Sequence, residues 1–195
     1  MGIMANLTPD PNSDELSTLL MEVEEFLVEN IPMAVKQEIL VEPIYGIILI
    51  YSGTDTDVTG YPPILLLPTV AYRDRVHSTM RPGDWSYMLW TSCEISGQPG
   101  VHSAVCDDPK LRKKLERIFD LTIGTDECDY EPVRLMFQRV VRRLNLLDWT
   151  AILNVPDDFI VVASDSHSEI SENYSDYISP DKISLLRQRG RLKME

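Results

Sequence analysis

The chain has 195 residues, and its 31 Asp and Glu outnumber its 18 Lys and Arg, which gives a net charge of −13. Hydrophobic residues make up 44% and charged residues 25%, a composition typical of a folded globular protein and not of a disordered one. Nucleic-acid binding needs Lys and Arg that neutralise phosphates, so this charge argues against a nucleic-acid partner. No apolar run is long enough to span a bilayer, so we expect no membrane association.

The N-terminal residues and the cysteines indicate the cellular compartment of the protein. The N-terminal stretch MGIMANLTPDPNSDE has neither the basic nor the apolar region of a secretory signal, and the three cysteines are widely spaced. We therefore expect a cytoplasmic protein without a disulfide framework. Residues 1–12 are expected to be a flexible lead-in and residues 13–195 a single domain, whose oligomeric state the sequence leaves open.

The first half of the chain predicts one helix followed by strands. Apolar residues recur at helical spacing over 12–31, with glutamates on the other side, and Pro32 then predicts a stop or a kink. YGIILIYSG at 45–53 is typical of a buried strand. PILLLPTVAY at 63–72 predicts a second strand, paired with the first as a hairpin, which Pro68 places at an edge or bulge.

Aromatic and apolar residues in DWSYMLWTSCEI, at 84–95, predict a third strand. Helices are predicted to begin at Asp108–Pro109 and at Glu131, a last strand at 158–165, and a closing helix at Ser179–Pro180. Helices and strands do not alternate as they do in βαβ units. The order predicts an α+β fold with a mainly antiparallel sheet of about four or more strands and helices packed on one face.

Carboxylates gather in two parts of the sequence. Residues 1–60 hold eleven acidic residues and one base, Lys36, whereas residues 157–176 hold six acidic residues and no base. An uneven negative surface speeds association with a basic protein, but it also keeps a protein soluble, and the charge pattern alone does not separate these roles. The residues expected to bind a basic partner are Glu22, Glu25, Glu29, Asp165, Glu169, Glu172 and Asp176.

The loop DTDVT, from Asp55 to Thr59, offers an enzymatic alternative. It resembles the D-x-D-x-T motif of haloacid-dehalogenase-like phosphatases, which implies that Asp55 attacks phosphorus and Asp57 acts as acid and base beside a metal ion. The nucleophile of that family follows its strand directly, whereas here three residues intervene. Asp and Thr are also ordinary residues for a turn between strands.

Other catalytic or cofactor-binding patterns are weaker. Cys93 or Cys106 with His102 would be the group to propose for a thiol nucleophile, yet no local signature surrounds either cysteine. The histidines lack metal-binding spacing, and the glycine motifs of nucleotide-binding proteins are absent from the sequence. We therefore expect no cofactor and no metal.

The layout of the chain carries a resemblance to a known group of proteins. An acidic leading helix is followed by GIILIYSG, DWSYMLW and an end that runs from FIVVASDSH to ISLLRQRGRL. This arrangement resembles small bacterial domains of unknown function among the immunity proteins of polymorphic toxin systems. The resemblance implies a non-enzymatic cytoplasmic protein that masks a toxin, often a basic nuclease, with an acidic face, and it carries over no individual residue.

The sequence thus favours a non-enzymatic module that binds a basic protein. The alternatives are a phosphatase-like hydrolase using Asp55 and Asp57 with a metal, and a structural subunit of an assembly.

Overall fold

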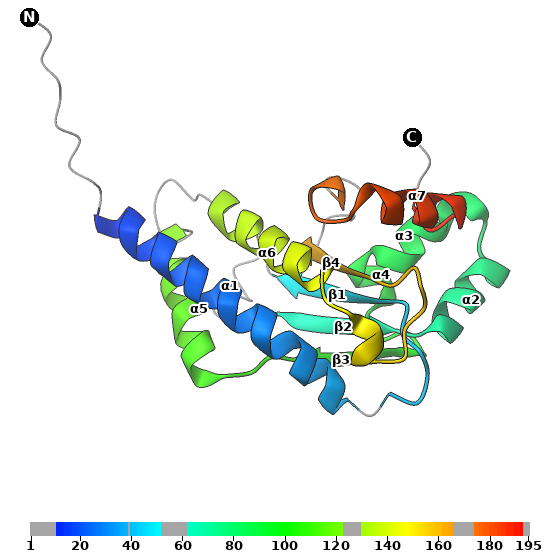
Figure 1. Cartoon of the computed structure of the whole chain (residues 1–195), viewed down its shortest axis with the longest axis horizontal. Coiled ribbons are helices and arrows are strands. Elements are labelled where there is room, and N and C mark those ends of the chain that lie inside the picture. Colours follow the sequence, from blue (N-terminus) through cyan, green and yellow to red (C-terminus); the bar gives the residue numbers. More distant parts are fainter. Residues whose placement is uncertain (1–10, 39, 52–61, 123–129, 166–173, 193–195) are drawn as a thin grey trace, which may run out of the picture.

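The computed structural model describes residues 11–38, 40–51, 62–122, 130–165 and 174–192. A four-stranded sheet lies at the centre, in the order β3-β2-β1-β4, with helices around it (Figure 1). Two of its pairings, β1 with β2 and β2 with β3, are antiparallel, whereas β1 and β4 are parallel. These features confirm the predicted α+β class and the mainly antiparallel sheet. The strands are β1 Gly46–Tyr51, β2 Ile64–Pro68, β3 Val101–Val105 and β4 Ile160–Asp165.

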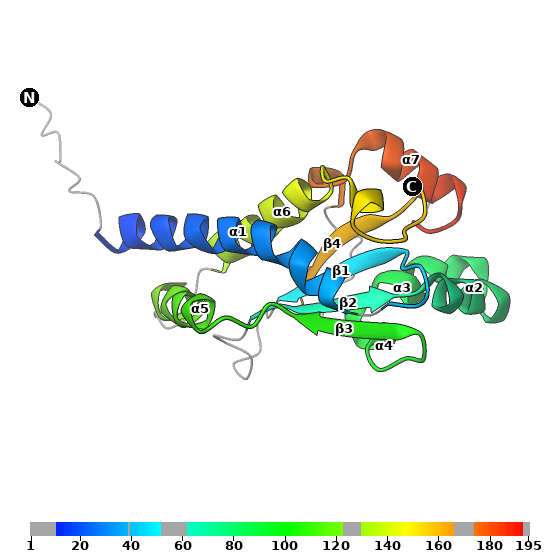
Figure 2. The same ribbon diagram turned by 60° about the horizontal axis from the view of Figure 1, so that its bottom comes forward.

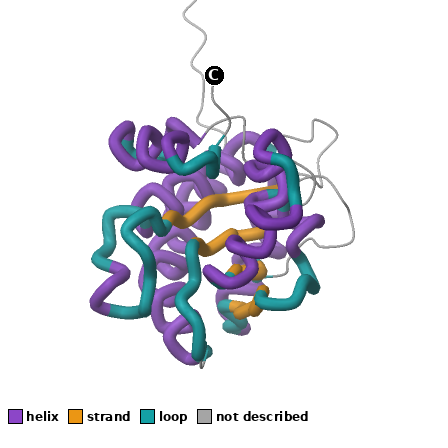
Figure 3. Tube along the Cα trace, turned by 90° about the vertical axis from the view of Figure 1, so that its right-hand side faces the viewer, coloured by secondary structure: helices purple, strands orange, loops and turns teal. Residues whose placement is uncertain are grey.

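The helices fill most of the described chain and surround the strands, as an end-on view makes clear (Figure 3). None of those in the described ranges has a stretch long and apolar enough to cross a membrane. The α-helices are α1 Pro11–Gln37, α2 Val70–Thr79, α3 Trp85–Trp90, α4 Ser92–Ile95, α5 Pro109–Thr122, α6 Glu131–Leu144 and α7 Pro180–Gln188. The short 3₁₀ helices are η1 Pro82–Asp84, η2 Trp149–Ala151 and η4 Tyr174–Asp176.

The side chains of β1 alternate between two covered faces, as the pleat requires. Tyr51 stacks on Phe137 of α6, with 4.5 Å between the ring centroids, so α6 and its neighbour α1 form the predicted helical layer. Gly46 lies on the other face against Trp90 of α3, where an added Cβ would stand 2.9 Å from the indole ring. The short α3 and α4 therefore add cover to the second face, and Figure 2 shows α3 beside the strands.

Helix α1 packs between α5 and α6 and extends beyond the sheet (Figure 1). Its apolar side chains Val23, Leu27 and Ile31 are completely buried, as their spacing predicts. The stop or kink expected at Pro32 does not end the helix, because Pro32 lies inside α1, which runs on to Gln37. Val35, one turn beyond the proline, is also completely buried. Burial of this face offsets the backbone hydrogen bond that proline cannot make.

Segment 84–95 is not the predicted strand but forms α3 and α4. Its aromatic residues fit a helix because tertiary contacts fix them. The indole Nε1 of Trp90 donates to the Arg191 carbonyl at 2.8 Å, and the Tyr45 hydroxyl donates to the Leu89 carbonyl at 2.7 Å. The remaining strand of the sheet is β3, which the sequence did not predict.

Pro68 lies neither at a sheet edge nor in a described bulge, because β2 is an inner strand between β1 and β3. The proline is the last residue of β2, and its carbonyl accepts from the Tyr45 N–H at 3.0 Å. Thr69 then caps α2 by accepting from the Tyr72 N–H at 3.2 Å. The predicted second strand is therefore shorter than its apolar run, and its last residues begin a helix.

Candidate functional site

A hollow of about 460 Å³ lies at the β4 side of the molecule. We call it the α6–α7 hollow. It opens between the C-terminal end of α6, η2, the segment 155–159, and the turn from η4 into α7. The first three of these segments follow one another along the chain, and the fourth comes after β4.

Asn145, the residue after α6, holds the inner wall of the hollow together. Its amide oxygen accepts from the Val161 N–H at 2.9 Å, and its amide nitrogen donates to the Val161 carbonyl at 2.8 Å and to the Tyr177 carbonyl at 3.3 Å. One side chain thus joins the end of α6 to the outer edge of β4 and to the approach to α7. At Val161 it takes the place of the hydrogen bonds that a further strand would make.

The turn after α6 supplies the next wall. Asp148 accepts from the backbone N–H of Thr150 at 3.1 Å and from its hydroxyl at 2.6 Å, and so begins η2. The hydroxyl bond is the main reason why the pKa of Asp148 lies below its ordinary value. Trp149 is buried and donates from Nε1 to the Leu144 carbonyl at 2.7 Å. The local sequence LNLLDW therefore makes a closed turn with its indole pointing inward.

The hollow has an apolar interior and an apolar rim. Trp149 and Phe159 pack against each other with 5.4 Å between their ring centroids, and Ile178 is buried beside the same hollow. Leu146 stands at the rim with 82% of its surface exposed, and Leu147 with 38%. Two exposed leucines thus stand beside an aromatic interior.

Charged groups surround this apolar lining. Arg142 donates to the Asp176 carbonyl, from Nε at 2.8 Å, and Lys182 donates to the Asp157 carbonyl at 2.5 Å. The Asp157 carboxylate receives two hydrogen bonds from Arg189, at 2.6 and 2.8 Å, which hold its pKa below the ordinary value. The carboxylates of Asp148 and Asp176 lie at the rim and are exposed to water.

Carboxylate, cysteine and histidine side chains are the other candidates for chemistry in the described chain. In the part of the chain that the structure describes, no group of three or more His, Cys, Asp or Glu side chains is placed to hold a metal ion. Burial raises the pKa of the Cys106 thiol to about 11, the opposite of what a thiolate nucleophile needs. Cys93 is exposed, and His77 packs on the ring of Trp85 in the α2–α3 region.

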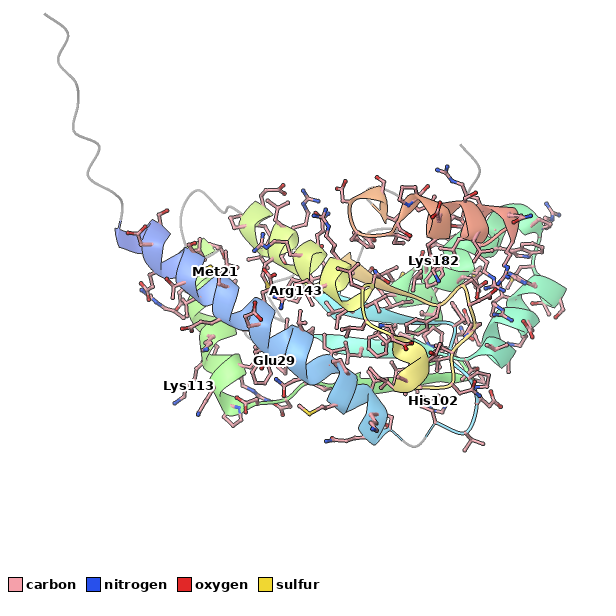
Figure 4. The ribbon with its side chains drawn as sticks, in the orientation of Figure 1. Met21, Glu29, His102, Lys113, Arg143 and Lys182 are labelled. Atoms are coloured by element: carbon pink, nitrogen blue, oxygen red, sulfur yellow. The ribbon has the colours of Figure 1, made fainter. Side chains whose placement is uncertain are left out.

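The acidic residues of α1 lie mostly against bases of the neighbouring helices. Glu25 forms a two-pronged ion pair with Arg143 of α6, at 2.6 and 2.9 Å, and Glu22 pairs with Lys114 of α5 at 2.9 Å. Glu29 is exposed and has no charged partner among the described residues. Figure 4 shows Glu29 on α1 and Arg143 on the α6 side. Of the predicted acidic contacts on α1, Glu29 is therefore the carboxylate left for another molecule.

Of the other predicted site residues, two lie within the described ranges and four lie outside them. Asp165 is the last residue of β4, and Asp176 lies in η4 and lines the α6–α7 hollow. The structure thus places one end of the acidic tract at the hollow. Four predicted residues lie outside the described ranges, namely Asp55, Asp57, Glu169 and Glu172.

The sequence did not indicate a buried ionic group next to the hollow. Asp158 is 1% exposed and forms ion pairs with Arg191 and, at 2.9 Å, with Arg189. Burial lowers the pKa of Arg191 to about 10, so the guanidinium remains charged at neutral pH. The basic residues Arg189 and Arg191 of the C-terminal segment are therefore fixed to the core.

Comparison of the chain with protein-family models, with curated proteins and with solved structures gives no match. The function is therefore inferred from the geometry of the hollow and the charge of the chain.

Proposed function

We propose that the chain is a non-enzymatic protein-binding module that holds a basic partner at the α6–α7 hollow. The observation that carries this proposal is the exposed Leu146 beside an aromatic-lined hollow of about 460 Å³. A partner of this kind would insert an apolar or aromatic anchor and cover the two rim leucines. Such anchors supply most of the affinity at protein interfaces.

The charge of the rim supports a partner with Lys or Arg next to that anchor. The charged residues that line the hollow have a net negative charge, because they are three aspartates and two bases: Asp148, Asp157, Asp176, Arg142 and Lys182. The two bases donate to backbone carbonyls, whereas Asp148 and Asp176 are exposed. The net charge of −13 adds a long-range attraction for a basic protein. Charge of this kind mainly raises the association rate, and the apolar anchor mainly slows dissociation.

This binding mode agrees with the role that the resemblance to immunity proteins implies, the masking of a basic toxin by an acidic protein. We place the main contact at the hollow and not on the acidic face of α1, because the glutamates of α1 are largely paired within the fold. Glu29 would remain as an outlying acidic contact.

The test is affinity capture from the native lysate followed by quantitative binding of the captured protein. Leu146→Asp should remove most of the binding, because it places an unpaired charge in the apolar contact. The matched control is Val41→Asp, since Val41 is 91% exposed, takes the same change, and does not line the hollow. Equal binding by both variants would contradict the proposal.

The electrostatic part is tested separately with the double change Asp148→Asn and Asp176→Asn. It should lower the association rate several-fold at low salt and have little effect at high salt, measured by surface plasmon resonance. A captured protein that is acidic, or binding that does not weaken with salt, would contradict this part.

A further inference from the structure

The two edges of the sheet differ in how they are closed. At the β4 edge, the Asn145 side chain takes both hydrogen-bonding groups of Val161. At the other edge, β3 pairs only with β2 among the described residues, and Figure 2 shows no described strand beyond it. β3 also lacks the lysine, proline or described bulge with which edge strands are commonly protected.

The backbone pattern of β3 shows which of its groups point to this open edge. Thr69 N–H donates to the Gly100 carbonyl at 2.9 Å, so Gly100 faces β2. Because direction alternates along an antiparallel strand, His102 and Ala104 also face β2, and Ser103 and Val105 face outward. Val101 N–H is already used by the Gln98 carbonyl at 3.1 Å, which leaves the Val101 carbonyl at the edge.

The sequence of β3, Val-His-Ser-Ala-Val, is close to symmetric about Ser103. If β3 pairs with a second β3 in antiparallel register about Ser103, each Val105 stands opposite a Val101. The two Ser103 residues then exchange their backbone hydrogen bonds, and each Val105 N–H donates to a Val101 carbonyl. Val105 is 48% exposed, so a cross-strand valine pair would remove apolar surface from water.

The charges at the two ends of β3 also suit an antiparallel copy. Arg75 lies at the N-terminal end, where it donates to the Pro99 carbonyl at 2.8 Å and is exposed. Asp107 lies beyond the C-terminal end, is exposed, and pairs with Arg112 of its own chain at 2.8 Å. In the register about Ser103, Asp107 of one chain stands opposite Pro99 of the other, so Arg75 of the second chain adds a further base beside the Asp107–Arg112 pair at each end.

From this symmetry, the outward hydrogen-bonding groups and the complementary ends, we propose that β3 is a dimerisation edge that pairs with the β3 of a second copy of this chain. The product is a continuous sheet of about 8 strands, which lies within the usual size of sheets, and a twofold axis at Ser103 relates its two halves. The α6–α7 hollow lies at the opposite edge of each sheet, so both hollows stay open in the dimer.

Sedimentation velocity over a concentration series tests this inference. The wild-type chain should shift from 22.3 kDa to twice that mass as its concentration rises. Ser103→Pro removes the central outward N–H without removing a bond to β2, and should raise the dimer dissociation constant by at least about tenfold. Ser103→Lys places like charges opposite each other on an exposed position and should act in the same direction.

Met21→Lys is the matched control, because Met21 is 57% exposed on α1 and lies far from His102 and β3 (Figure 4). It should leave the dimer unchanged. Amide exchange followed by NMR should slow at Ser103 and Val105 as concentration rises, and stay constant at Ala104, which already faces β2. A wild-type chain that stays monomeric, or a dimer that resists both Ser103 variants, would overturn the inference.

Discussion

Asn145 shows how much one side chain can fix in this fold. Its amide serves both backbone groups of Val161 and the carbonyl of Tyr177, at distances from 2.8 to 3.3 Å. It therefore closes the outer edge of β4 and sets the distance between α6 and the approach to α7. The α6–α7 hollow exists because this amide holds its inner wall in place.

We expect Asn145→Ala to lower the free energy of unfolding by about 2–3 kcal/mol, because it leaves partly buried backbone groups without partners. Urea unfolding followed by tryptophan fluorescence measures this change. The control is Asn154→Ala, an exposed asparagine in the following loop, which should stay within about 0.5 kcal/mol of wild type. An equal loss in both variants would show that the bonds of Asn145 carry no special weight.

At this scale the sequence predicted burial better than it predicted polar contacts. Val133, Phe137 and Val140 are buried, as their spacing in α6 indicates. The roles of Asn145 and Asp158 had no sequence signal of comparable strength, because their partners lie at distant positions that only the fold brings near. Of the predicted contacts in the acidic tract, Asp165 ends β4 and Asp176 lies at the hollow, whereas Glu169 and Glu172 lie outside the described residues.

At the scale of whole elements, α1 is held by charge as well as by its apolar face. Its glutamates face bases on α5 and α6, as in the pairs Glu22–Lys114 and Glu25–Arg143. Exposed pairs of this kind add little stability each, but they fix the orientation of a helix between its neighbours. The acidic face that the sequence predicts on α1 is thus partly neutralised by ion pairs within the structure.

We expect Glu25→Gln and Glu29→Gln to differ. Arg143 lowers the pKa of Glu25 by hydrogen bonding, so the contribution of this pair is present at neutral pH and is lost as pH falls through the lowered pKa. Glu25→Gln should slightly lower the urea midpoint at neutral pH, an effect that acid or high salt removes. Glu29→Gln should leave the midpoint unchanged and slow association with the basic partner.

Urea titrations at two pH values and association rates at low salt separate the two variants. If Glu25→Gln slows association as much as Glu29→Gln does, the paired glutamates of α1 also contact the partner, and our assignment of Glu29 as the free carboxylate is wrong.

Element type was predictable where long periodic segments left one choice. α5 and α6 begin at their predicted residues, and β1 matches its apolar run. The strand prediction for 84–95 was wrong for a physical reason. Trp85, Met88 and Leu89 fit helical spacing, and the aromatic residues of the segment also suit a strand. Tertiary contacts, such as those of Trp90 with Gly46 and with the Arg191 carbonyl, favour the helix.

The strand Val101–Val105 was missed because few of its residues strongly favour strands.

At the scale of the whole molecule, the C-terminal segment joins parts that are distant in sequence. Gly190 has a positive φ of 67° and lies against the ring of Trp85, where an added Cβ would stand 2.9 Å from the ring. Arg191 follows, with its carbonyl on Trp90 and its guanidinium on buried Asp158. The segment thus connects α3 to the start of β4 and stabilises the sheet from one end of the chain.

We expect Arg191→Met to lower the free energy of unfolding by about 3–5 kcal/mol, because it leaves the buried Asp158 carboxylate with weaker compensation. Asp158→Leu alone should cost a similar amount by leaving Arg191 uncompensated. The double variant should be more stable than either single one, since it removes both buried charges together. Urea unfolding of all four chains completes the double-mutant cycle. If the two single changes simply add, the pair is not coupled, and the C-terminal segment is held by its other contacts, those of Arg189 with Asp157, of Gly190 with Trp85 and of the Arg191 carbonyl with Trp90.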